Sequence, residues 1–175
     1  MSESKSNARR IALNGILGAL ALISLFLATV MPTSRLALYG LSSFFVSVAI
    51  IESGIRAGWL FYGSTALLGL IIVPDKLAVV PYIIFFGFYG MAKYYIEKLG
   101  RLIPEYIIKF AYFNAALAMA WLLIKQVFIA EITLKLPWFV IIIGLEAVFL
   151  IYDLVYTMFI AYYRDKLRKI LRIGN

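Results

Sequence analysis

Two carboxylates in the last apolar run are the side chains of this sequence best placed to do chemistry. The run from Trp138 to Tyr163 has 26 residues and carries Glu146 and Asp153, seven positions apart. In a helix these two acids face nearly the same way, roughly 12 Å and 22 Å along from Trp138. At such depth in a bilayer, a carboxylate is costly unless it pairs, faces protein or water, or takes up a proton. We therefore expect a functional pocket or proton-linked role, structural pairing, or an acid that stays protonated and is simply hydrogen-bonded, and the sequence leaves these alternatives open.

Other catalytic chemistry has few residues to work with. The chain contains no Cys and no His, so it has no thiol nucleophile and lacks the commonest metal ligand and general base. Only the carboxylates remain as candidate catalytic groups, and no further acid accompanies Glu146 and Asp153 at a spacing that is diagnostic of an active site. We predict that the protein is not an enzyme, and that it binds no metal and no cofactor.

Composition points to a membrane protein. Of the 175 residues, 64% are hydrophobic and only 15% are charged, and the long apolar runs are typical of membrane-spanning helices. A net charge of +8 would suggest nucleic acid for a soluble protein, but in a membrane protein it indicates basic residues on the cytoplasmic side. We expect a multi-pass protein of the cell membrane, in contact with lipid and not with nucleic acid.

The positions of these runs define the elements that must hold the two acids. We predict an all-α integral membrane protein, with six transmembrane helices in one bundle and a single domain covering residues 1–175. The expected helices span about 11–31, 36–51, 57–73, 77–92, 105–124 and 138–163, and a basic tail follows over 164–175. The fourth helix has Pro81 near its start, and we expect the proline to bend it.

The basic residues orient this bundle. Thirteen of the 17 Lys and Arg residues fall in segments on the side of the termini, and the other four are Arg35, Lys76, Lys125 and Lys135. Because short loops rich in Lys and Arg stay in the cytoplasm, we predict that both termini are cytoplasmic.

Several polar residues have a structural and a functional interpretation. Asn114 lies about halfway along its helix and either bonds a neighbouring helix or contacts a ligand. Glu52 and Arg56 have the spacing of a helical ion pair. Asp75 stands where an N-cap belongs, although Lys76 beside it could instead bind an anion. The basic residues of the outer side, Arg35 among them, could pair with Glu146 or with a shared polar ligand.

The first helix carries small residues on two faces. One face holds Ala12, Gly15 and Ala19, and the second holds Ala21, Ser24 and Ala28. Small residues let helix backbones approach closely in a bilayer. The small residues either pack inside the bundle or form a docking face for another membrane subunit. Two such faces are more than one neighbour needs, and we predict docking through Ala12, Gly15 and Ala19.

The basic start followed by this helix, RRIALNGILGALALI, resembles the S components of energy-coupling-factor transporters, the substrate-binding membrane subunits of vitamin uptake systems. The resemblance covers most of the chain as a pattern of helices. Its one motif-like piece is the family's alanine-x-x-x-alanine element, which docks on the coupling subunit. Gly15 and Ala19 stand at that spacing here, with glycine in place of the first alanine.

This resemblance implies a solute pocket in the outer half, roofed by the loop between the first two helices and lined by the last three. Matching positions would be Arg35, Tyr82, Asn114, Lys125 and Glu146, and we add the deeper Asp153 to the predicted binding site. The solute would be a vitamin or micronutrient. Because the sequence has no nucleotide-binding loop, a transmembrane coupling subunit and partner ATPases would supply the energy.

The sequence also fits a second class of protein. Scaffold proteins of cell-shape and cell-wall elongation complexes are also small membrane proteins with several helices. They bind protein partners and take up no solute. The sequence alone does not separate this alternative from substrate capture.

Overall fold

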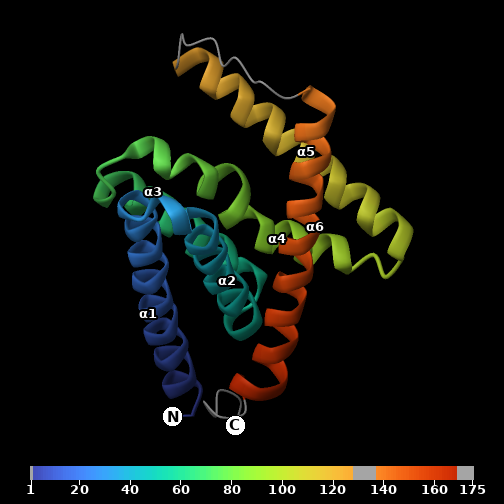
Figure 1. The fold of residues 1–175 in the computed structure, drawn as a ribbon. Coiled ribbons are helices and arrows are strands. Elements are labelled where there is room, and N and C mark those ends of the chain that lie inside the picture. The colour runs from blue at the N-terminus through green and yellow to red at the C-terminus, as the bar shows by residue number, and fades with distance from the viewer. Residues whose placement is uncertain (1, 128–136, 169–175) are drawn as a thin grey trace.

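The computed structural model describes residues 2–127 and 137–168, and within these ranges every regular element is helical (Figure 1). The long helices are α1 (Ser2–Val30), α2 (Arg35–Ser53), α3 (Ile55–Ile72), α4 (Gly87–Glu97), α5 (Leu102–Val127) and α6 (Trp138–Tyr162). Four short pieces join or extend them: η1 (Pro32–Ser34), η2 (Lys76–Ala78), η3 (Tyr82–Phe86) and η4 (Tyr163–Leu167).

Six helical stretches of the described chain are long and apolar enough to cross a membrane. The shortest of them, Ile55–Ile72, has 18 residues, which lies within the range that spans a hydrocarbon core. The fourth stretch, Lys76–Glu97, combines η2, η3 and α4. The predicted all-α class and the six apolar helices are therefore confirmed, and the protein has the features of a multi-pass membrane protein.

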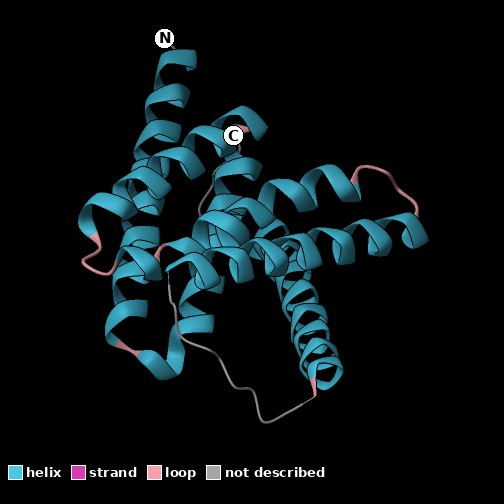
Figure 2. Cartoon of the chain, turned by 90° about the horizontal axis from the view of Figure 1, so that it is seen from above, coloured by secondary structure: helices cyan, strands magenta, loops and turns pink. Residues whose placement is uncertain are grey.

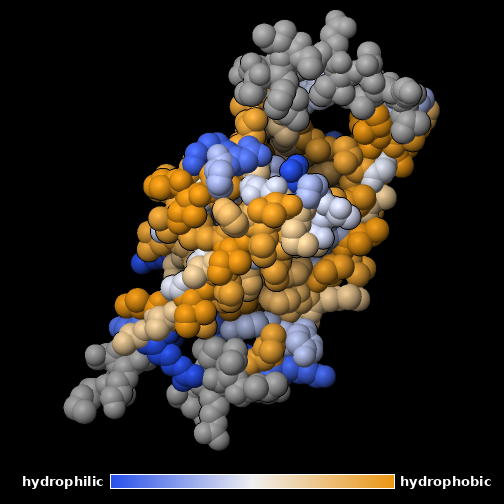
Figure 3. All heavy atoms as spheres, turned by 60° about the vertical axis from the view of Figure 1, so that its left-hand side comes forward, coloured by the Kyte–Doolittle hydropathy of each residue, from blue (hydrophilic) through white to orange (hydrophobic). Residues whose placement is uncertain are grey.

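The surface agrees with this assignment. Apolar side chains cover the middle of the face shown in Figure 3, and polar side chains gather toward its two ends. Many of the exposed large side chains are aliphatic, among them Leu60, Ile71 and Ile151, which are 74%, 73% and 65% exposed. Such a surface suits contact with lipid, since exposed apolar patches of this extent are rare on soluble monomers.

The most tightly packed part of the molecule is formed by α1, α2, α3 and the fourth stretch. Leu25 of α1 and Val46 of α2 are buried in the same cluster as Val79 and Tyr82. The small face of α1 that carries Ala21, Ser24 and Ala28 is buried there, and it lets α1 lie close to its neighbours. The views in Figures 1 and 2 show α5 and α6 reaching beyond this core.

The fourth stretch is irregular around Pro81. A 3₁₀ turn (η2) precedes the proline, a π-helical segment (η3) follows it, and regular α-helix begins only at Gly87. Proline has no N–H to donate, so carbonyl groups near it lose helical partners. Tyrosine hydroxyls bond to carbonyls in this region: Tyr62 donates to the Ile83 carbonyl at 2.7 Å and Tyr112 to the Phe85 carbonyl at 3.0 Å. Neighbouring helices thus stabilise an irregular backbone that would be costly in lipid.

Two details near the turns settle expectations from the sequence. Asp75 does act as an N-cap, because its carboxylate accepts a bond from the Leu77 amide at 3.1 Å.

The helical ion pair expected between Glu52 and Arg56 is wrong. Gly54, with a φ of 88°, ends α2 between them, so they do not share a helix. Glu52 pairs instead with Arg168, with 3.2 Å between Oε1 and Nε.

The crossing of α2, α4 and α6 leaves no room beside Gly90. A Cβ added there would lie 2.7 Å from the Tyr156 hydroxyl and 3.4 Å from Ser47 Oγ, two atoms that are hydrogen-bonded to each other at 2.6 Å. We predict that Gly90→Ala lowers the free energy of unfolding by about 1–3 kcal/mol, because Tyr156 must move. Denaturation in mixed micelles measures this.

The matched control is Gly63→Ala in α3, where an added Cβ meets nothing within 4 Å. This change should be neutral or stabilise the helix by up to about 1 kcal/mol. Equal stability of the two variants would contradict the close crossing.

Candidate functional site

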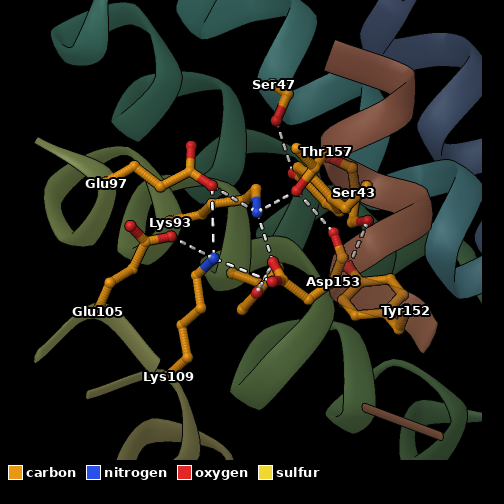
Figure 4. A network of polar contacts seen from close by, with 11 residues as sticks. Ser43, Ser47, Lys93, Glu97, Glu105, Lys109, Tyr152, Asp153 and Thr157 are labelled. Atoms are coloured by element: carbon orange, nitrogen blue, oxygen red, sulfur yellow. Dashed lines mark hydrogen bonds and ion pairs between the residues drawn. The ribbon is translucent and has the colours of Figure 1, made fainter. Parts of the chain in front are cut away.

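Asp153 lies in a buried cluster of charged side chains that joins three helices (Figure 4). Its Oδ1 is paired with the Lys93 ammonium of α4, and its Oδ2 lies 2.9 Å from the Lys109 ammonium of α5. The Tyr89 hydroxyl also donates to Oδ1, at 2.6 Å. One carboxylate of α6 therefore receives donors from both neighbouring helices.

Two further acids complete the cluster. Glu97 Oε1 lies 2.6 Å from Lys93 Nζ and 3.4 Å from Lys109 Nζ, and Glu105 Oε1 lies 2.8 Å from Lys109 Nζ. Lys93 also donates to the Thr157 hydroxyl at 2.8 Å. Two ammonium groups thus face three carboxylates, and each ammonium group contacts at least two of them.

Burial makes this pairing obligatory. Lys93, Lys109 and Asp153 are 1%, 2% and 5% exposed, and all three belong to stretches that can cross a membrane. Removing one partner of such a group leaves an uncompensated buried charge, which costs far more than the pair contributes. Because each charged group already has partners, the cluster is better suited to holding α4, α5 and α6 together than to binding a solute.

Helix spacing alone does not connect the two lysines with Asp153. Both enter the sequence prediction only as two of the thirteen basic residues on the side of the termini. The sequence does contain a sign of this cluster. One turn is flanked by two pairs of opposite charges, each four residues apart, namely Lys93–Glu97 and Glu105–Lys109. Such a charged hairpin end, beside a run with an unpaired Asp, indicates an interhelical ion cluster.

A cavity of about 920 Å³ lies beside the start of α2, where Arg35 and Leu36 line it. Its walls come from the start of α2, the η2 and η3 region, the later part of α5 and the first half of α6. The lining side chains are mostly apolar, with the aromatic residues Tyr39, Phe85, Phe86, Phe113, Phe149 and Tyr152. A cavity of this size and composition is typical of sites for small molecules.

The cavity and the ends of the described chain lie on opposite sides. The start of α1 and the end of α6 are at the bottom of Figure 1, whereas the turns beside the cavity are near its upper part. Tyr152 and Asp153 are neighbours in α6, and one lines the cavity while the other lies in the ion cluster.

Arg35 is the residue of the predicted solute site that lines the cavity, and its Nε donates to the Ala28 carbonyl at 3.0 Å. Tyr82 is fully buried away from the cavity, and its hydroxyl is 2.7 Å from that of Thr65. Lys125 belongs to α5, but its side chain lies outside the described part of the structure.

Glu146 and Asn114 lie together, but outside the cavity wall. The Asn114 amide donates to Glu146 Oε1 at 2.6 Å and to the Phe110 carbonyl at 2.9 Å. Asn114 therefore joins α5 to α6. Among the described residues, Glu146 has this amide and no basic side chain as its partner.

The predicted docking face of α1 is free in the structure. Ala12, Gly15 and Ala19 are all exposed, and a Cβ added at Gly15 would meet nothing within 4 Å. The opposite small face is buried in the core, as described above. Only one of the two small faces is thus used within the described chain.

Comparisons with protein-family models, with curated proteins and with solved structures gave no match.

The ion cluster predicts a large effect of removing its central charge. Asp153→Asn leaves two buried ammonium groups with less negative charge, and we expect it to lower the free energy of unfolding by about 3–5 kcal/mol. Adding Lys93→Met should restore part of this loss, because one uncompensated charge is then removed. Thermal unfolding in detergent compares the variants.

Asp165→Asn serves as the control, since Asp165 is an exposed carboxylate of η4. Its effect should stay within about 0.5 kcal/mol. If the Asp153→Asn protein is as stable as the wild type, the cluster does not hold these helices together.

Proposed function

We propose that this protein is the substrate-capture subunit of a membrane importer for a vitamin or micronutrient, comparable to an S component of an energy-coupling-factor transporter. The observation that carries the proposal is the cavity of about 920 Å³ between α2, η3, α5 and α6. A scaffold has no need for such a cavity. In this proposal the protein is a binding subunit without enzymatic activity, and it uses no cofactor of its own.

The distribution of basic residues supports an orientation with cytoplasmic termini in the cell membrane. Thirteen of the 17 Lys and Arg residues belong to the side of the termini by the count above. The cavity lies at the opposite end, so in this orientation it faces the outside. The protein would capture its solute from the external medium.

The exposed small face of α1 supports a partner within the membrane. Ala12, Gly15 and Ala19 leave a surface that another helix can approach closely. In the proposed transporter this partner is the transmembrane coupling subunit, which carries the ATPases. The alternative, a scaffold of a cell-wall elongation complex, would use the same face for a protein partner but would leave the cavity without a role.

Filling the cavity separates these two functions. Ala120 lines it, whereas Ala118 of the same helix is exposed and lies outside its wall. We predict that protein purified in mild detergent from its own membrane carries a small molecule, detected by extraction and mass spectrometry. Ala120→Trp should lower its amount about tenfold or more, since a loss of 1.4 kcal/mol in binding is already tenfold.

Ala118→Trp is the matched control and should leave the amount of the small molecule unchanged. If wild-type protein and both variants carry the same small molecules in equal amounts, the cavity is not a binding site. Co-purification of cell-wall synthesis proteins without any small molecule would favour the scaffold.

A further inference from the structure

The polar groups around the cavity are nearly all engaged with the protein itself. The Tyr39 hydroxyl donates to the Ala78 carbonyl at 2.6 Å, and the Tyr152 hydroxyl lies 2.8 Å from Ser43 Oγ. The carboxylate of Asp75 accepts the capping bond from Leu77. A polar ligand would have to compete with these bonds, so these three side chains are poorly placed to recognise one.

Arg35 is different. Arg35 is an exposed residue that lines the cavity, and one of its three guanidinium nitrogens, Nε, bonds to the Ala28 carbonyl. Its two terminal nitrogens have no hydrogen-bond partner within the described ranges, and no carboxylate there lies within 4 Å of the group. These two terminal nitrogens carry four N–H groups in the planar arrangement that fits a carboxylate or a phosphate.

The remaining walls favour a flat apolar body. Phe113 and Phe149 stack with their ring centroids 4.5 Å apart, and Phe85 lies 5.5 Å and 6.0 Å from these two rings. Aromatic rings associate with other rings in offset or edge-to-face arrangements beyond the gain from burial alone. The cavity thus offers aromatic surfaces, and its charged lining residues are Arg35 and the capping Asp75.

We infer that the cavity binds an organic anion with an aromatic body, whose acidic group is held by Arg35 and whose ring lies against Phe85, Phe113 and Phe149. This inference rests on the proposed function and adds the class of its solute. The body is drawn to the rings, and the charge is drawn to the guanidinium. We place its source in the aqueous phase, because fatty-acid chains offer no ring for these walls.

A photoreactive aromatic acid tests the inference. The full-length protein in lipid nanodiscs is irradiated with 4-benzoylbenzoate or with the uncharged 4-benzoylbenzamide, and labelled peptides are identified by mass spectrometry. The acid should label the cavity-lining parts of α5 and α6 about tenfold more than the amide, the effect expected for one charged hydrogen-bonded contact. Arg35→Gln should lower labelling by the acid to the level of the amide, and Arg35→Lys should retain part of the difference.

The outcomes are distinct. Equal labelling by acid and amide, or an unchanged preference in a folded Arg35→Gln protein, would overturn the assignment to an anion. Displacement of the acid by excess hexadecanoate, without displacement by unlabelled benzoate, would overturn the aromatic aqueous source in favour of a lipid. If neither probe labels the cavity but a small molecule still co-purifies and is lost in Ala120→Trp, this inference fails and the proposed function stands. If neither probe labels the cavity and no small molecule co-purifies, both this inference and the proposed function are refuted.

Discussion

The arrangement of the last three helices depends on the need to pair charges inside an apolar span. Asp153 is buried and cannot remain unpaired there, and it is paired with one lysine from α4 and one from α5. These contacts fix which face of α6 meets its neighbours. Phe149, one turn earlier, and Tyr152, one residue earlier, then face the cavity. The same constraint that buries the charges therefore shapes the wall of the candidate binding site.

The other wall of the cavity also depends on satisfying polar groups. The η3 segment contributes Ile84, Phe85 and Phe86 to the lining, and its irregular backbone is stabilised by tyrosine hydroxyls from α3 and α5. Short π-helical segments occur frequently at functional sites. The hydrogen bonds that stabilise this wall thus come from Tyr62 and Tyr112, which do not line the cavity themselves.

Hydrophobic runs and turn residues were sufficient to predict six apolar helices, since run length is a strong signal in membrane proteins. The sequence also showed that Asp153 needs a partner. It did not identify Lys93 and Lys109, because helix spacing gives the face of a residue but not the rotation of one helix against another. The expected Glu52–Arg56 pair is wrong for a related reason. Gly54, with its positive φ, ends the helix between the two residues, and spacing predicts a contact only within one continuous helix.

In the proposed function the cavity opens to the outside of the cell. A single cysteine at Leu77, a partly exposed residue of the cavity rim, tests this directly, because the natural chain has no Cys. A membrane-impermeant maleimide should label Leu77→Cys in intact cells, while Asn7→Cys, near the start of α1, should react only after the membrane is opened. Labelling of Leu77→Cys only in opened cells would place the cavity on the cytoplasmic side and contradict capture from outside.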